Sequence, residues 1–541
     1  MRSINGLIRY LLFFLSHSLV MNKSMDQKNH TRNIAIIIGN DCTNSDLSKC
    51  GEGNIKAPEI GQLAAKGLTL NKAFGCVAIA CMTVLLFNTR EVSAQSGHPN
   101  VVLIFIDDMG YGDLSCFGNQ VIQTPHIDGL AKRGIRFTNF YVNSPICSPS
   151  RAALLTGKYP MSWKIHSYIE RREENERRGM NDWLDADAPT LAKVFKENGY
   201  RTGHFGKWHL GGGRDVGDAP LPSTYGFDRS LVSFEGLGNR ILFRNDRLSE
   251  ASSKLGNGPV TWVEKHESTK IYVDSALNFI QENPSDPFYV HLFPNDVHDP
   301  HLPVTGAVEK YQGMARSASE ARFFAVLEDL DEQIGRFIGS LDEMGKLDNT
   351  IIVFTSDNGP TDWPRYYRDG EYPPGFTGGF LGRKWSLYEG GIRMPFIVSW
   401  PKKIPEGMTD SQTVMSAVDL MPSLMRLADL QGVPNGDGED RSQAMLGTPL
   451  TDHRPIMWEY GSAQGGSILP GHDKNVSPNL AILDKGWKLL INADSSRAEL
   501  YHIDEDPFES KNRVNDKGEL ARKLAAKVLD WRRRYAVPLI E

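Results

Sequence analysis

Two acidic pairs in the sequence follow apolar runs and could hold a metal ion. Asp107 and Asp108 end the run "NVVLIFIDD", and Asp357 and Asn358 end "NTIIVFTSDNG". A single pair of this kind is most often a helix cap or a surface turn. Two pairs, each at the end of an apolar strand, favour a site for a hard cation such as calcium or magnesium, because both ions prefer oxygen ligands.

The segment "SPICSPSRAALLTG" contains Cys147, the last cysteine of the chain. It could be a thiol nucleophile, a buried structural residue or a residue that is chemically modified. Spacing alone gives Cys147 no convincing partner for thiol catalysis.

Further polar candidates lie beside glycines and aromatic residues. "GKWHLG" holds Lys207 and His209, and "GRKWSLYEGGIRMPF" holds Lys384 and Arg393. A lone lysine is usually solvated, and a lone histidine is usually structural. Glycine neighbours, however, suit places where the backbone approaches a ligand closely.

The elements that must position these residues alternate between strands and helices. Apolar runs predict buried strands at "NVVLIFI", "YRTGHFGK", "PFYVHLF" and "NTIIVFTS", while "TPHIDGLAKRG", "LAKVFKENG", "SALNFIQENP" and "LDEQIGRFIGSLDEMG" predict helices. This alternation indicates an α/β fold with a large, doubly wound, mostly parallel sheet. Such sheets bind ligands at the carboxyl ends of their strands, so we expect both acidic pairs and His298 to meet there.

After about residue 430 the pattern changes to short strands and a terminal helix. "PIMWEYG" and "LAILDKGWKLLINAD" predict a small antiparallel sheet, and "GELARKLAAKVLDWRRRY" predicts a helix. We therefore expect a catalytic domain over residues 98–430 and a small α+β subdomain over 431–541, behind an N-terminal extension of residues 1–97.

Composition excludes some partners. The 541 residues carry 60 Lys and Arg against 66 Asp and Glu, a net charge of -6, so no global basic field predicts binding to nucleic acid or an anionic membrane. The six cysteines lack the spacing of a disulfide framework or a zinc site, so they do not reveal the redox compartment.

The extension contains signal-like runs and an internal repeat. "LIRYLLFFLSHSLV" and "CVAIACMTVLLF" are too short to span a bilayer but resemble export signals, so we expect a periplasmic or secreted protein without a stable membrane span. Residues 33–67 align without a gap to residues 100–134. We interpret residues 32–83 as a degenerate, inactive copy of the start of the catalytic domain.

The Cys-x-Pro-Ser-Arg segment, together with "DDMGYGDL", "GYRTGHFGKWHLG", "SDNG", "EGGIRMPF" and "ELYHIDEDPFES", resembles the signature of the type I sulfatases in the alkaline phosphatase superfamily. The resemblance spans about residues 98–541. It implies that a maturation enzyme, reading Pro149 and Arg151, oxidises Cys147 to Cα-formylglycine, and that the hydrated aldehyde is the nucleophile.

The same resemblance implies residue roles. Asp107, Asp108, Asp357 and Asn358 would bind calcium together with residue 147. Arg151 and Lys207 would hold the hydrate, and His209 would be the base that releases sulfate. Lys384 and His298 would contact the sulfate and the departing alcohol. "NDVHDPHLP" leaves open whether His298 or His301 takes that place.

The implied activity is hydrolysis of a sulfate ester on an aryl group or a sugar. A phosphate or phosphonate monoester hydrolase is the enzymatic alternative, since tetrahedral anions look alike to a cationic site. A non-catalytic binding module is disfavoured because no matched catalytic position is lost. We expect residues 161–186 and 229–262 to rim the pocket, and sulfated glycans, including 6-sulfated galactose or N-acetylgalactosamine, are credible substrates.

Overall fold

The computed structural model describes residues 98–432, 435–452, 454–461 and 468–535. The N-terminal extension lies outside the described residues, so the expectations about its signal-like runs and its repeat stay predictions. None of the helices within the described part is long and apolar enough to cross a membrane.

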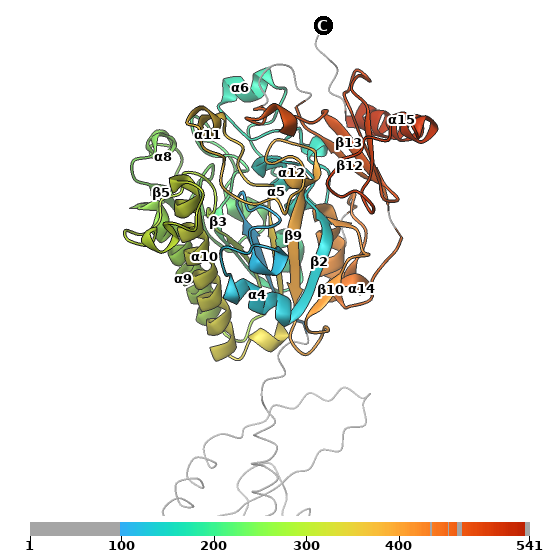
Figure 1. The fold of residues 1–541 in the computed structure, drawn as a ribbon. Coiled ribbons are helices and arrows are strands. Elements are labelled where there is room, and N and C mark those ends of the chain that lie inside the picture. The colour runs from blue at the N-terminus through green and yellow to red at the C-terminus, as the bar shows by residue number, and fades with distance from the viewer. Residues whose placement is uncertain (1–97, 433–434, 453, 462–467, 536–541) are drawn as a thin grey trace, which may run out of the picture. The chain divides into compact units, whose positions relative to one another are not determined.

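A large mixed sheet forms the centre of the fold (Figure 1). Its strands run in the order β10-β2-β9-β8-β1-β7-β3-β4-β5-β6, with β11 paired to β2. All pairs are parallel except those of β9, which is antiparallel to both β2 and β8. The strands are β1 (Asn100–Ile106), β2 (Gly134–Tyr141), β3 (Arg201–Lys207), β4 (Arg229–Ser233), β5 (Arg240–Phe243), β6 (Val260–Val263), β7 (Phe288–Phe293), β8 (Thr350–Ser356), β9 (Arg393–Ser399), β10 (Met408–Asp410) and β11 (Met415–Ser416).

Helices cover both faces of this sheet. Val101, Leu103 and Phe105 of β1 pack into one core, while Val102, Ile104 and Ile106 pack into the other. Because neighbouring residues of a strand point to opposite faces, a strand buried on both sides must be apolar throughout. The first core is covered by α5 (Cys147–Thr156), α7 (Leu191–Glu197) and α13 (Leu420–Leu427), and the second by α4 (Pro125–Lys132), α9 (Ser268–Glu282) and α10 (Ala318–Glu343). The predicted doubly wound fold is confirmed.

Shorter helices lie in the connections. They are α6 (Arg172–Arg177), α8 (Arg247–Ser252), α11 (Pro364–Arg368), α12 (Glu389–Ile392) and α14 (Ser442–Met445). The helix expected at "LAKVFKENG" is α7, and the Thr190 hydroxyl caps it by accepting the Lys193 N–H at 3.2 Å.

A second, smaller sheet follows, as predicted. Its antiparallel strands are β12 (Ile456–Glu459), β13 (Leu480–Asp484), β14 (Trp487–Ile491) and β15 (Glu499–His502). The helix α15 (Gly518–Tyr535) packs Leu524, Val528 and Trp531 against the apolar side chains of β13 and β14. This helix and sheet form the red region of Figure 1.

The close approach of β3 to β7 depends on Gly206, directly before Lys207. Its φ is +130°, and a Cβ there would lie 1.9 Å from the Phe293 carbonyl oxygen. We expect Gly206→Ala to destabilise the protein by about 3 kcal/mol, through backbone strain and overpacking. Urea unfolding measures this effect.

Gly339→Ala is the matched control, because a Cβ on this α10 residue meets nothing within 4 Å. It should leave stability unchanged or raise it by about 0.5–1 kcal/mol, the usual gain of alanine over glycine in a helix. Equal unfolding midpoints for the two variants would contradict the close approach.

Candidate active site

The register of β1 and β8 brings the two acidic pairs together. Ile106 is paired with Ser356, so the next residues, Asp107 and Asp357, leave the sheet side by side. The Asp108 N–H donates to the Asp357 carboxylate at 3.1 Å, and the Asn358 amide donates to the Asp108 carboxylate at 2.8 Å. The expectation that strand ends gather these four residues is confirmed.

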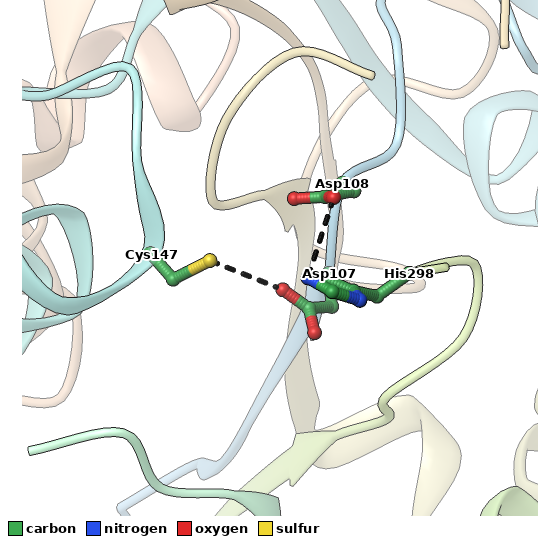
Figure 2. Close-up of side chains that lie close together, drawn as sticks. All are labelled: Asp107, Asp108, Cys147 and His298. Atoms are coloured by element: carbon green, nitrogen blue, oxygen red, sulfur yellow. Dashed lines mark hydrogen bonds and ion pairs between the residues drawn. The ribbon is translucent and has the colours of Figure 1, made fainter. Parts of the chain in front are cut away.

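Cys147 faces this cluster from the first turn of α5. Its Sγ lies 3.6 Å from Asp107 Oδ1, 3.3 Å from Lys207 Nζ and 3.6 Å from Lys384 Nζ. Figure 2 shows the sulfur directed at Asp107, with Asp108 and His298 beside it. Burial raises the pKa of the thiol to about 12, although Lys207 and Lys384 oppose the shift. A thiol held protonated is a poor nucleophile, which weighs against cysteine chemistry.

Three buried cations pair with the three carboxylates. Lys207 Nζ binds both oxygens of Asp107 at 2.7 and 2.8 Å, and Lys384 Nζ binds both oxygens of Asp108 at 2.6 and 2.8 Å. The Arg151 guanidinium lies 2.7 Å from Asp357 and 3.4 Å from Asp107. The predicted basic residues therefore converge on the predicted acids.

The carboxylates titrate differently because their partners differ. Burial alone would raise the pKa of Asp107, but Lys207, His298 and Arg151 together hold it well below its usual range. For Asp357, burial and the charge of Asp107 raise the pKa to about 7 despite Arg151. Negative charge at Asp357 thus remains undercompensated by the protein's own cations.

The oxygen donors of the site fit a hard cation, whereas the sulfur of Cys147 and the imidazole of His298 are ligands that softer metals prefer. Ligand atoms of Asp107, Asp108, Cys147 and His298 lie within 4.8 Å of one another. The buried Asn358 Oδ1 has no hydrogen-bond partner in the described part of the chain, and an unpaired buried oxygen is costly. Oxygen donors beside an undercompensated carboxylate are the environment that a divalent cation stabilises.

His209 follows Lys207 by two residues in the chain and lines the central cavity. The ring is buried, meets Phe234 edge-on at 4.8 Å, and neither nitrogen has a hydrogen-bond partner among the described residues. Burial, reinforced by Lys207 and Arg151, holds its pKa well below the ordinary value. The ring is therefore neutral at ordinary pH.

The structure separates the two candidate histidines of "NDVHDPHLP". His298 lines the central cavity, and its Nε2 lies 3.6 Å from Asp108 Oδ2. His301 turns away: it is buried against Phe323 and bonds the Val297 carbonyl at 2.9 Å. Arg393, grouped with Lys384 by sequence, also lies elsewhere, since it bonds Glu389 and the Thr138 carbonyl.

A cavity of about 410 Å³ opens above Cys147. Both expected insertions contribute to its lining, Tyr168 and Glu170 from one and Phe234 and Arg244 from the other. Sequence reasoning missed several lining residues that carry no local signal, namely Arg214, Lys265, Asn295, Trp363 and Trp385. Only their place in the fold reveals them.

The site combines buried cations, oxygen donors for a metal and an imidazole without a hydrogen-bond partner in the described chain, all at one edge of the sheet. This combination defines a hydrolase site for anionic tetrahedral esters. Comparison with known proteins narrows this class. Residues 99–430 match the family model "Sulfatase", and residues 378–534 match "N-sulphoglucosamine sulphohydrolase, C-terminal".

Similar proteins agree with this match. An N-acetylgalactosamine-6-O-sulfatase of Bacteroides thetaiotaomicron is 31% identical, over 81% of this chain and 93% of its own length. Arylsulfatase A of Homo sapiens is 33% identical, over 66% of this chain and 70% of its own length. The solved structure of Ps i-CgsB in complex with k-i-k-neocarrahexaose has a TM-score of 0.63 and 26% identity, covering 80% of this chain and 92% of that one. The chain belongs to the type I sulfatase family and is a sulfatase, a hydrolase of sulfuric esters.

The positions of the two histidines generate a test. We expect His298→Ala to lower kcat/KM for an aryl sulfate by about 10²–10⁴-fold, the usual contribution of a positioned proton donor or acceptor. His301→Ala should keep kcat/KM near the parent value, because its ring does not reach the cavity. Comparable losses in two equally folded variants, checked by melting midpoint, would contradict the assignment.

Proposed function

We propose that this sulfatase removes sulfate from sulfated carbohydrates, using formylglycine at position 147 and a bound calcium ion. The observation that carries the proposal is the arrangement around Cys147. A buried side chain with a strongly disfavoured thiolate lies within 3.6 Å of two ammonium groups and a carboxylate. This arrangement suits an anionic ester more than it suits a thiol.

Formylglycine at position 147 would supply, as its hydrate, a hydroxyl nucleophile and a second hydroxyl through which sulfate can be released. In the folded chain, Cys147, Pro149 and Arg151 are all buried. The maturation enzyme therefore has to meet this segment before the domain folds.

Calcium bound to Asp107, Asp108, Asp357, Asn358 and residue 147 would polarise the sulfate and favour the deprotonated nucleophile. The support for these ligands is the orphaned Asn358 Oδ1 and the undercompensated Asp357.

The chain's own side chains would then divide the remaining work. Arg151 and Lys207 hold Asp357 and Asp107 in place and orient the group at position 147. Lys384, whose pKa Asp108 raises although burial opposes it, stays an ammonium that can bind a sulfate oxygen. His298 lies at the cavity wall, where its imidazole, whose pKa burial lowers to about 4, can hydrogen-bond the oxygen of the departing alcohol, and His209 is the candidate base for the proton whose loss releases sulfate.

A sugar is the substrate class that the cavity favours. The rings of Tyr168, Phe234, Trp363 and Trp385 line it beside polar Glu170, Arg214 and Asn295. Aromatic rings pack against the apolar faces of sugars, while polar groups bind hydroxyls. The similar Bacteroides thetaiotaomicron protein is an N-acetylgalactosamine-6-O-sulfatase, so a 6-sulfated hexosamine or galactose is the first candidate.

The proposal extends to organisation and location. Residues 98–430 would form the catalytic domain and residues 431–541 the C-terminal subdomain. The signal-like runs would direct the protein to the periplasm or out of the cell.

Replacing Cys147 tests the nucleophile. We expect Cys147→Ala to lower kcat for 4-nitrophenyl sulfate by about 10⁴-fold or more, the scale of losing a nucleophile. Peptide mass spectrometry of active parent protein should show an aldehyde at position 147. Cys116→Ser is the control, since Cys116 is outside the cavity. An intact thiol at 147 in fully active protein would refute the mechanism.

The same assay tests the substrate class. The parent should prefer 4-nitrophenyl sulfate to 4-nitrophenyl phosphate, and in a panel of sulfated sugars a 6-sulfated N-acetylgalactosamine or galactose should be turned over. If none of the sulfated sugars is hydrolysed, the carbohydrate assignment is wrong and the protein is an aryl sulfatase.

Calcium binding has a readout independent of turnover. Calcium at about 100 times its dissociation constant should stabilise the chelator-treated protein by about 2.7 kcal/mol, because a ligand of the native state favours folding. Magnesium should stabilise it less, since that ion demands a stricter octahedron. Asn358→Ala should lose most of the calcium-dependent shift in melting midpoint; an undiminished shift would place the ion elsewhere.

A further inference from the structure

A second hollow, of about 350 Å³, lies outside the catalytic cavity and shares none of its lining residues. The segment between α11 and α12 forms most of it, and residues of the C-terminal region complete it. The side chains that matter are Arg316, Tyr372, Phe376, Arg383, Lys474 and Phe508.

This hollow gathers exposed aromatic side chains. Tyr372 is 41% exposed, Phe376 44% and Phe508 51%. They are the large aromatic residues that the described part of the chain leaves exposed, and all three line the same hollow. Aromatic rings are normally buried, so their collection in one concave place indicates a ligand-binding surface.

The charge of the hollow is one-sided. Three cations line it, Arg316, Arg383 and Lys474, and none of the described residues lining it is acidic, although the whole chain has a net charge of -6. Behind the lining, Glu320 pairs with Arg316 and Asp362 lies 3.6 Å from Arg383, so Lys474 is the lining cation whose charge the described residues leave unpaired. Exposed Lys474 lies with its ammonium 5.7 Å from the Tyr372 ring centre and has no ion pair among the described residues. The charge is complementary to an anionic ligand.

Hydrogen bonds to backbone groups hold the wall of the hollow in place. The Asp113 carboxylate accepts the N–H groups of Phe376 and Gly110, both at 2.6 Å, and the Gly112 N–H donates to the Phe376 carbonyl at 2.8 Å. The Arg383 guanidinium donates to the carbonyls of Thr361 and Gly375. A preorganised aromatic wall loses less conformational entropy when a ligand binds.

We propose that this hollow is a second carbohydrate-binding site, which holds a sulfated segment of a glycan chain away from the catalytic cavity. Rings of Tyr372, Phe376 and Phe508 would pack on sugar faces, and Lys474 and Arg316 would face the sulfate groups. The choice of a sulfated glycan over another anion rests on the proposed function.

The two sites have neighbouring residues of one segment in their walls. Arg383 lines the hollow, and its neighbour Lys384 binds Asp108 in the catalytic cluster. A glycan held at the hollow keeps its other sulfate esters at a raised local concentration near the catalytic cavity. The site should therefore matter for long substrates and not for small ones.

Binding is tested on the full chain carrying Cys147→Ala, which cannot turn substrate over. The probes are a chondroitin 6-sulfate oligosaccharide and its desulfated counterpart, titrated by calorimetry. We expect Tyr372→Ala with Phe508→Ala to weaken binding of the sulfated probe by about tenfold, the combined loss of two aromatic contacts. Lys474→Gln should weaken it at low salt and less at high salt. Lys403→Gln, on another exposed lysine, is the matched control and should bind as the parent does.

In active protein, the aromatic variants should raise KM for the oligosaccharide and leave kcat/KM for 4-nitrophenyl sulfate unchanged. Unaltered affinity in the aromatic variants, or equal binding of the desulfated probe, overturns the proposal. So does a dimer in analytical ultracentrifugation that the aromatic variants dissociate, since a second copy would then occupy the hollow. Oligosaccharide binding that depends on these residues in a protein inactive on every sulfate ester would refute the proposed function and support the second site.

Discussion

The burial of three carboxylates at one edge of a parallel sheet is the constraint on which the rest of the site depends. Moving a carboxylate from water into a protein interior costs several kcal/mol unless it is paired. Asp107, Asp108 and Asp357 are all buried, and the register of β1 against β8 leaves them no room to separate. Each therefore requires a cation, and the fold supplies Lys207, Lys384 and Arg151 from three different segments.

The three cations do not fully compensate the negative charge of the three carboxylates. Asp357 keeps a pKa near 7 because burial and Asp107 outweigh Arg151, and the Asn358 oxygen has no partner in the described chain. A site that balanced all its charges would gain little from a divalent cation or an anionic ester. The charge left unbalanced here lowers the stability of the folded protein, and a charge of opposite sign placed beside it would restore that stability.

Three residues of the site have a strained backbone. Asp108, His209 and Trp385 adopt positive φ values of 62°, 52° and 71°, and each belongs to the acidic cluster or lines the cavity. Non-glycine residues in this conformation cost about 1–3 kcal/mol each and persist where the surroundings fix them. The α/β core, packed on both faces of the sheet, provides that rigidity. The segment from Tyr372 to Lys384 links the aromatic hollow, which Tyr372 lines, to the catalytic cluster, where Lys384 binds Asp108.

The sequence by itself determined the central strands β1, β3, β7 and β8, the helices α4, α7, α9 and α10, and the polar residues that meet at the strand ends. A strand covered on both faces must be continuously apolar, and ligands bind at the carboxyl ends of such strands. The run "NVVLIFIDD" therefore predicted both a buried strand and a functional site at its end. Tertiary structure alone decided which distant groups meet. The Lys384–Asp108 ion pair joins residues 276 positions apart, His298 faces the cavity while His301 does not, and Phe508 meets the loop that carries Tyr372. Such contacts depend on strand order, loop course and packing, which no local pattern of residues encodes.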